Sequence, residues 1–315
     1  MANEASILSN PTSIPEAVST GYQRQNTNMI AARVGMDETV VVGGAGKCTL
    51  KVSGPVDVNG VLYTIDSEVE FALSIAGEYI IYLEDSIAGH LTPKITSQPG
   101  LFVADKNAHY TTDGYRILNW LIQYNGTNAI AYKIGRDRFE TVITASGQWR
   151  CMFSQPYEIV MCGKGGNGGG AVNQTYGGSG GGALTGYKKL YIEASDTWTA
   201  VFSSASGGTC SFANIANTLQ AQNGYNGVTD AGLDAITACG STHAGFDRVV
   251  AGKYSAGASF GGDSELGIGG ENGFLFGSHV GGNGKGYGAG AGSGWKSGVN
   301  GTGGTGAPAV IIIKG

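Results

Sequence analysis

The sequence predicts an all-β chain: an N-terminal antiparallel β-sandwich-like domain over residues 38–144, then a glycine-rich domain of packed polyglycine II helices with flanking β-strands over residues 145–315. Three observations predict this fold class. Short β-branched runs alternate with turn residues before residue 145. Of the 56 glycines, 42 lie from Met161 onward. Apolar, strand-like segments separate the glycine runs.

Residues 1–37 are predicted to be an attachment or oligomerisation segment. The segment is polar, contains Pro11 and Pro15, and favours a short helix over Glu16–Arg33 whose apolar residues are too few for a core of its own. Such a helix needs partners, either its own domain or other copies of the chain. Met1–Pro15 lacks the cationic start and apolar core of a secretory signal, so we expect synthesis in the cytosol.

Residues 38–144 have the pattern of a β-sandwich that acts as a spacer. Strands are expected at Thr39–Val42, Thr49–Val52, Val61–Ile65, Val69–Leu73 and Tyr79–Leu83. Asn59-Gly60 lies between two apolar runs and predicts a hairpin turn. A second turn is expected at Asn125-Gly126, between Tyr115–Tyr124 and Ala129–Ile134.

The glycine-rich domain needs an architecture that uses the missing Cβ, because glycine loses the most backbone entropy on folding. Polyglycine II helices satisfy this need, since their backbone groups pair sideways with neighbouring helices. Disorder is disfavoured by interspersed strands at Gln148–Phe153, Tyr157–Cys162, Leu190–Ile192, Trp198–Phe202 and Ala309–Ile313. Collagen is excluded because glycine has no strict period of three and the chain has only 7 prolines. The first and last strands should form a base, and the loops should lie at the free ends.

Composition argues against several partners. Only 14% of the 315 residues are charged and the net charge is −5 with no basic patch, so nucleic acid is not an expected partner. No stretch approaches the ~20 apolar residues of a membrane span, so membrane insertion is not expected. The five cysteines form an odd set without close pairing. They predict buried free thiols rather than a disulfide framework or a zinc site.

No motif indicates catalysis, so we expect no catalytic residues, no metal, no cofactor and no enzymatic activity. Matches to GxGxxG arise by chance at this glycine density, and no βαβ unit accompanies them. The histidines lack metal-binding spacing and lie at His90, His109, His243 and His279. A hydrolase would need two carboxylates across a cleft. The acids available for this in the second half are Asp230, Asp234, Asp247, Asp263, Glu265 and Glu271.

Aromatic residues within glycine-spaced loops are the informative feature of the second half. Two longer interruptions, Asn223–Phe260 and Gly273–His279, place aromatics where a polyglycine helix interior has no room for them. Function usually lies in loops that a stiff frame supports, and recognition loops favour aromatic residues mixed with Gly, Ser and Asn. The alternative is that these aromatics only cap the apolar ends of the bundle. The expected receptor contacts are Tyr176, Tyr225, His243, Phe246, Phe274, Phe276, His279 and Trp295.

The stretch Ala145–Gly315 resembles the glycine-rich C-terminal domains of phage tail-fibre and receptor-binding proteins. The resemblance rests on an opening Ala145-Ser146-Gly147-Gln148-Trp149, a strand running into Gly163–Gly170, a middle Ser211-Phe212, and the closing elements Gly286–Gly290 and Gly306–Ile312. By architecture it is also similar to the tip adhesins of T-even-type phages. It departs from the pattern at Ser154-Gln155-Pro156, where a Pro-Ala-Gly turn is usual, and in the long insertion Asn223–Phe260.

The resemblance implies a virion protein of a tail fibre or baseplate, assembled in the host cytoplasm, that recognises the host surface. Its partners would be a bacterial surface glycan or outer-membrane protein, and other tail or baseplate proteins through residues 1–37. Fibres are commonly homo-oligomers, with a trimer favoured, although no heptad seam is present. Two alternatives remain open: a surface-polysaccharide depolymerase, and a purely structural fibre or decoration protein.

Overall fold

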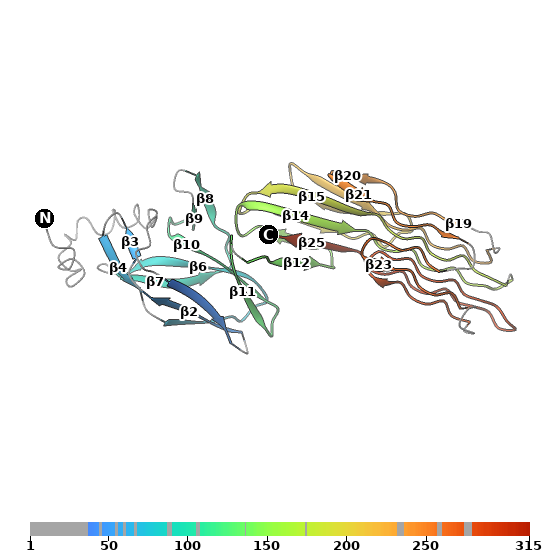
Figure 1. The fold of residues 1–315 in the computed structure, drawn as a ribbon, viewed down its shortest axis with the longest axis horizontal. Coiled ribbons are helices and arrows are strands. Elements are labelled where there is room, and N and C mark those ends of the chain that lie inside the picture. Colours follow the sequence, from blue (N-terminus) through green and yellow to red (C-terminus); the bar gives the residue numbers. More distant parts are fainter. Residues whose placement is uncertain are drawn as a thin grey trace. The chain divides into compact units, whose positions relative to one another are not determined.

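The computed structural model describes residues 37–43, 46–53, 56–58, 61–65, 68–86, 90–104, 108–135, 137–173, 175–231, 236–256, 260–273 and 279–315. Nearly all of the expected attachment segment, including its expected helix, lies outside this range. The chain divides into two compact units. Unit 1 contains residues 37–139, 150–155 and 191–196, and unit 2 contains residues 140–149, 156–190 and 197–315. The described residues of both units form β-strands and no α-helix, so the all-β prediction is confirmed (Figure 1).

Unit 1 is built from two sheets. In the described residues, one sheet has the order β1 (Asp37–Val42), β2 (Lys47–Ser53), β5 (Glu68–Ala72). The other has the order β3 (Val56–Val58), β4 (Val61–Ile65), β7 (His90–Thr96), β6 (Gly77–Ser86), β10 (Arg116–Tyr124), β9 (Ala108–Tyr110), β8 (Leu101–Val103), with β11 (Ala129–Lys133) beside β10. The pairings are antiparallel apart from β4 with β7.

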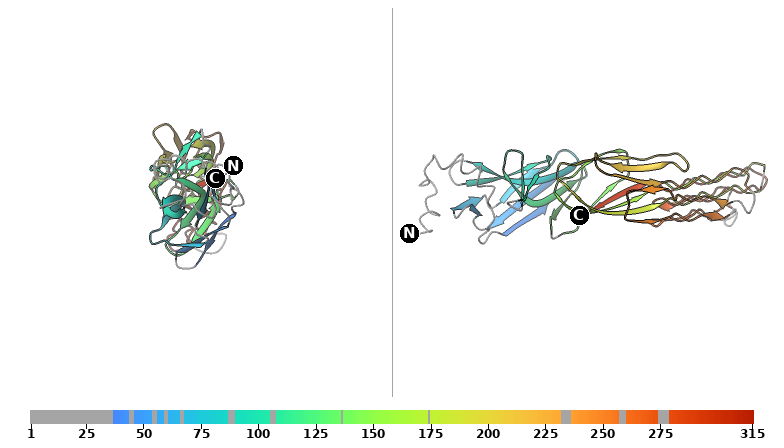
Figure 2. Two further views of the ribbon diagram at one scale, coloured as in Figure 1. Left: turned by 90° about the vertical axis from the view of Figure 1, so that its left-hand side faces the viewer. Right: turned by 90° about the horizontal axis from the view of Figure 1, so that it is seen from above.

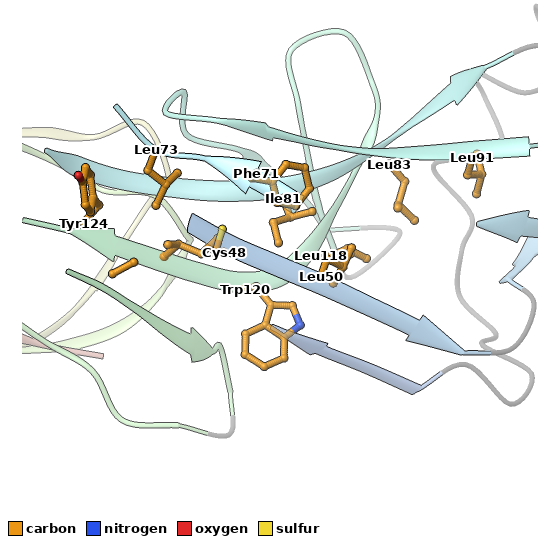
Figure 3. Close-up of a cluster of buried hydrophobic side chains, with 12 residues drawn as sticks. Cys48, Leu50, Phe71, Leu73, Ile81, Leu83, Leu91, Leu118, Trp120 and Tyr124 are labelled. Atoms are coloured by element: carbon orange, nitrogen blue, oxygen red, sulfur yellow. The ribbon is translucent and has the colours of Figure 1, made fainter. Parts of the chain in front are cut away.

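One apolar core takes side chains from both sheets of unit 1 (Figure 3). Cys48, Leu50 and Phe71 come from the smaller sheet, and the larger sheet contributes Ile81, Leu83, Leu91, Leu118, Trp120, Ile122 and Tyr124. Alternate residues of β2 are buried because successive side chains of a strand point to opposite faces. The β-branched runs of the sequence therefore become a layered pair of sheets that share one interior.

Both predicted hairpins of unit 1 are confirmed. Strands β3 and β4 pair antiparallel with Val58 opposite Val61, the register that the expected hairpin requires, while residues 59–60 lie outside the described residues. Strands β10 and β11 pair with Tyr124 opposite Ala129. In that turn Gly126 has a φ of 95°, which only glycine adopts without strain, and Asn125 Oδ1 accepts the N–H groups of Thr127 and Asn128.

Two sheets form the base of unit 2. Within the described residues, the first has the order β12 (Glu140–Ile143), β25 (Val310–Lys314), β14 (Gln155–Cys162), β15 (Thr185–Ile192), β21 (Arg248–Val250). The second has the order β13 (Gly147–Arg150), β16 (Thr197–Val201), β17 (Thr209–Ala213), β18 (Thr218–Gln222), β20 (His243–Ala244). Two short ribbons join β19 (Ile236–Thr237) to β22 (Ser255–Ala256) and β23 (Gly267–Ile268) to β24 (Lys285–Gly286).

The first and last strands of the predicted glycine-rich domain pair as expected, since β14 and β25 lie antiparallel with Cys162 opposite Val310. Trp198 stacks on Phe212 at 4.9 Å between ring centroids, and Trp149 lies within 6.3 Å of the same ring. One expectation is corrected: the strand expected over Gln148–Phe153 ends at Arg150. The chain turns there because Cys151 exchanges backbone hydrogen bonds with Ser195 and Asp196.

The glycine runs of unit 2 leave the base strands as extended segments that lie side by side (Figures 1 and 2). Their backbone hydrogen bonds repeat every three residues, whereas a β-strand repeats every two. On the first run, Gly163, Gly166 and Gly169 donate to the carbonyl oxygens of Leu184, Gly181 and Gly178. The intervening Gly165, Gly168 and Ala171 donate to Ala307, Gly304 and Gly301 on another run. Each run is therefore bonded sideways to more than one neighbour.

Glycine is required at these contacts because no space remains for a Cβ atom. A Cβ at Gly180 would lie 2.1 Å from the carbonyl oxygen of Gly166, and one at Gly290 would lie 2.0 Å from that of Gly180. Non-bonded carbon contacts are ordinarily about 3.5 Å or longer. The runs can therefore approach this closely only because the sequence places glycine at the contact positions.

Asparagine side chains extend the same network. In the described runs, Asn226 Oδ1 accepts the N–H of Asn167, and Asn167 Oδ1 accepts the N–H of Gly306. In the same way, Asn223 Oδ1 accepts the N–H of Lys164, and Asn283 Oδ1 accepts the N–H of Thr305. These side-chain amides satisfy backbone donors that have no neighbouring carbonyl, which explains why asparagine recurs within the glycine runs.

All five cysteines are buried and free, as predicted. Burial raises the pKa of Cys48 to about 11. It does the same for Cys162, whose sulfur also lies 3.2 Å from the hydroxyl of Thr185. Cys48 and Cys162 therefore stay protonated and serve as small apolar groups of the core.

His109 of unit 1 is buried in its neutral form. Its side chain is only 7% exposed, and Nε2 accepts the N–H of Ser154 at 2.8 Å. Burial, together with the charge of Arg116, lowers the pKa of His109 to about 4. Protonation of the ring would break the bond to Ser154, which links β9 to residues 150–155.

The first prediction concerns the glycine contacts. Gly180→Ala should lower the free energy of unfolding of unit 2 by at least about 2 kcal/mol, because the added methyl overlaps a backbone carbonyl that has no room to move. Gly147→Ala is the matched control, since nothing lies within 4 Å of its Cβ position. Chemical denaturation followed by circular dichroism measures both. Equal stability of the two variants would contradict the account of the contacts.

The second prediction concerns pH. Because the folded pKa of His109 is about 4 and the unfolded value about 6.5, the unfolded chain binds the extra proton between these values. Stability should therefore be full above pH 6.5 and fall by about 3 kcal/mol as the pH decreases to 4. His109→Gln should flatten this dependence. Urea titrations of both proteins from pH 4 to 7.5 measure it, and parallel curves would contradict the role of His109.

Candidate functional site

Several connections between glycine runs gather at the end of unit 2 farthest from β14 and β25 (Figure 1). The hydrogen bonds place them together: Ala171 bonds to Gly301, Gly177 to Gly294, and Gly178 to Val228. We call the described residues of these turns the loop cluster, comprising residues 172–173, 175–176, 228–230, 279–280 and 295–300. The runs hold both ends of each turn, so the scaffold fixes where the turns lie.

Three of the residues expected from the sequence meet in the loop cluster. Tyr176 and Trp295 pair through an isolated antiparallel bridge. The ring of His279 stacks on the indole of Trp295, with 5.6 Å between centroids and 12° between planes. His279 Nδ1 also lies 3.1 Å from the carbonyl oxygen of Trp295, an oxygen that can only accept, so Nδ1 carries a proton in this contact. All three side chains are half-buried, which leaves part of each ring at the surface.

Asp230 fixes the turn that begins at Val172. Its Oδ1 accepts the N–H groups of Val172 and Asn173 at 2.5 and 2.7 Å, and its Oδ2 accepts the side-chain amide of Asn173 at 2.8 Å. The backbone of Asp230 has a φ of 57°, a conformation that Asp and Asn tolerate better than other non-glycine residues. The carboxylate therefore joins two separate turns.

The loop cluster presents apolar side chains and little charge. Four valines are well exposed, with Val172 at 39%, Val228 at 66%, Val280 at 55% and Val299 at 59%. Its described charged residues are Asp230 and Lys296, and both bond within the cluster, Lys296 through its ammonium group to the carbonyl oxygen of Val172. Exposed apolar groups gathered on a fixed support are typical of an interaction surface.

Three other expected contact residues lie elsewhere in unit 2. Tyr225 is 38% exposed on the flank of the glycine runs, where its ring lies against Gly207 and its hydroxyl accepts the side-chain amide of Gln222. His243 is exposed in β20 of the base. Phe246 is half-buried with its ring over Gly186, a contact that a Cβ at Gly186 would prevent. Phe274 and Phe276 lie outside the described residues.

Three of the acids considered for hydrolysis, Asp230, Asp247 and Asp263, bind backbone N–H groups of the structure. Asp247 binds Lys188 Nζ and the N–H of Lys189, and these bonds lower its pKa. Burial of Asp263 raises its pKa, but the N–H of Gly269 and the ammonium of Lys253 outweigh that effect and lower it. A general acid needs a raised pKa, so these two residues do not suit that role. Asp234 lies outside the described residues.

The described residues hold neither a candidate metal site nor a candidate membrane-spanning helix. No group of three or more His, Cys, Asp or Glu side chains there could hold a metal ion. Among those same residues, no helix has the length and apolar character needed to cross a membrane.

Sequence reasoning missed the valines of the loop cluster and the roles of Asp230 and Lys296. A valine beside a glycine run is equally compatible with a buried strand position. The sequence pattern therefore does not predict that its side chain is exposed. Asp230 could have been found as a turn residue, because Asp side chains commonly bond to nearby backbone N–H groups. Its partners, however, lie 57 and 58 positions earlier in the chain.

Comparisons with known proteins add no assignment. No protein-family model matches the sequence, and no curated protein matches it significantly. Its function must therefore be argued from the site itself.

The third prediction tests the turn that Asp230 holds. Asp230→Ala should lower the free energy of unfolding of unit 2 by about 1–3 kcal/mol, because two backbone donors lose their acceptor and alanine is strained at a positive φ. Asp230→Asn is the control, since it keeps one acceptor oxygen and tolerates the same φ. Amide hydrogen exchange at residues 172 and 173 reports the turn directly. Unchanged exchange in the alanine variant would contradict the assignment.

Proposed function

We propose that this chain is a receptor-binding protein, an adhesin of a phage tail fibre or baseplate, that recognises the bacterial host surface through the loop cluster. The observation that carries the proposal is the combination of half-buried aromatic rings and exposed valines on turns whose ends are hydrogen-bonded into a close-packed backbone scaffold. Rigid aromatic residues bind with little loss of conformational entropy. A scaffold that fixes them in advance reduces the cost of association further.

The scaffold in this proposal is a bundle of polyglycine II helices. Hydrogen bonds that repeat every three residues, bonding of each run to several neighbours, and the absence of space for Cβ atoms support this interpretation. Polyglycine II has three residues per turn and no internal hydrogen bonds, so it needs such lateral partners. The resemblance of Ala145–Gly315 to phage glycine-rich domains is consistent with the same architecture.

The partner in this proposal is a bacterial surface glycan or an outer-membrane protein. Because Asp230 and Lys296 already bond within the loop cluster, recognition there depends on shape and apolar contact rather than on charge. The remaining expectations stay proposals: residues 1–37 bind other tail or baseplate proteins, the chain forms a homo-oligomer, with a trimer favoured, and the protein belongs to the virion. Several copies on one particle would add avidity to weak individual contacts.

The two alternatives receive less support. A depolymerase needs a pair of carboxylates with separated roles, and the carboxylates of Asp230, Asp247 and Asp263 each accept backbone N–H groups instead. A purely structural fibre protein leaves the exposed apolar turns unexplained. We therefore propose no catalytic residues, no cofactor and no metal for this chain.

The fourth prediction tests recognition. The full-length chain, labelled with a fluorophore, should bind cells of at least one strain in a panel of bacteria with different envelopes, as measured by flow cytometry. Trp295→Ala should weaken this binding at least tenfold, because it removes the ring on which His279 stacks. Raising the salt from 50 to 300 mM should change it little, since Asp230 and Lys296, the described charged residues of the loop cluster, carry opposite charges that sum to zero.

Ile215→Ser provides the matched control. Ile215 is also an exposed apolar residue of unit 2, but it lies in the turn between β17 and β18. Its variant should bind as the parent does. Binding to no strain, or equal binding by the Trp295 variant, would overturn the proposal. Release of reducing ends from purified surface glycan would instead favour the depolymerase.

A further inference from the structure

A separate pocket lies on the flank of unit 2, formed by the turn between Asp263 and β23. It is open to solvent and has a volume of about 480 Å³. Its lining consists of Lys253, Asp263, Ser264, Glu265, Leu266, Gly267 and Ile268. This volume falls in the range of about 300–1,000 Å³ typical of small-ligand sites.

The walls of the pocket are held by several independent contacts. Ser264 and Gly267 pair through an isolated bridge, which closes the turn. Asp263 Oδ1 accepts the N–H of Gly269 at 2.9 Å, and its Oδ2 accepts the ammonium of Lys253 at 2.8 Å. The hydroxyl of Ser264 bonds to the carbonyl oxygen of Tyr287. The pocket is therefore defined by backbone pairing as well as by an ion pair.

The lining combines apolar and polar groups on neighbouring residues. Ile268 is 69% exposed and Leu266 is half-buried, so both offer aliphatic surface. Glu265 is exposed between Ser264 and Leu266 and its carboxylate is a hydrogen-bond acceptor. A pyranose ring has the matching pattern, because its C–H groups form apolar patches and its hydroxyls donate hydrogen bonds.

Charge around the pocket favours an uncharged ligand. The ammonium of Lys253 is balanced by the carboxylate of Asp263. Beyond this pair, Tyr187 donates its hydroxyl to Glu265 at 3.5 Å, and the guanidinium of Arg248 lies 3.9 Å over the ring of Tyr187. The lining thus holds one cationic and two anionic side chains, and Arg248 adds a second cation nearby through its contact with Tyr187. An ionic ligand would gain little from this balance, whereas hydroxyl groups can bond to both kinds of side chain.

We infer that this pocket is a second binding site of the chain and takes a neutral pyranose unit of a saccharide. The aliphatic side chains of Leu266 and Ile268 pack against one face of the sugar. Its hydroxyls donate to Glu265 and accept from Lys253. The site is separate from the loop cluster: Gly182 bonds to Lys253, whereas Gly177 bonds to Gly294 beside the cluster. Gly177 and Gly182 are five residues apart on one run. At a rise of roughly 3.1 Å per residue, the two sites lie about 15 Å apart along that run.

The experiment uses the full-length chain and three probes: methyl α-D-glucopyranoside, methyl α-D-galactopyranoside and N-acetyl-D-glucosamine. Saturation-transfer NMR should show contact with at least one of them, with a dissociation constant in the millimolar range that single-sugar sites commonly have. Glu265→Gln, which keeps the size of the side chain, should weaken that binding at least fivefold. Ile268→Ser should do the same by removing the aliphatic surface. Circular dichroism verifies that both variants are folded.

Two controls separate this site from the proposed adhesin surface. Trp295→Ala and Ile215→Ser should leave the binding of the sugar unchanged, because both residues lie away from the pocket. Lack of binding by all three probes at 50 mM would overturn the inference. So would binding that the Glu265 and Ile268 variants retain in full. Failure of cell binding in the Trp295 test would leave the sugar result standing, so the two proposals fail independently.

Discussion

Everything in unit 2 depends on backbone segments that approach so closely that only hydrogen atoms fit between them. A Cβ at Gly180 would lie within 2.1 Å of a carbonyl oxygen, so the contact exists only because the residue has no side chain. Glycine makes an extended segment costly in entropy, and lateral hydrogen bonds to several neighbours offset that cost. Ordinary apolar packing remains in the base, where Trp198 stacks on Phe212 of the neighbouring strand.

Much of the fold could be predicted because its signals are local. Alternating β-branched residues predicted β1, β2 and β4, and Asn125-Gly126 predicted the hairpin of β10 and β11. The site was predicted only in part, since its residues come together through long-range pairing. Tyr176, His279 and Trp295 meet because three runs turn at one level, which no local pattern encodes. Phe246 was expected to lie near a loop tip, but a neighbouring glycine, Gly186, leaves room for its ring to be packed against β15.

Three carboxylates of unit 2 bind backbone N–H groups and hold the chain in place beside the glycine runs. Asp230 joins two turns of the loop cluster, Asp247 binds both Lys188 and the backbone of Lys189, and Asp263 closes the flank pocket. Such carboxylates satisfy backbone donors where a run ends and the regular network stops. Aromatic and aliphatic side chains are then left as the groups that face outward at the turns. This division of roles explains how a chain with 14% charged residues can still build defined loops.

The three-residue repeat of hydrogen bonds also limits how such a protein can evolve. Adding or deleting one residue within the run from Gly163 to Ala171 would shift every later donor away from its acceptor on both neighbouring runs. Changes of three residues would restore the alignment, so run lengths should vary among descendants in multiples of three. The turns carry no such restriction, because their ends are fixed by the runs and their interiors are not in the repeat. Insertions of any length can therefore accumulate there while the support beneath them stays the same.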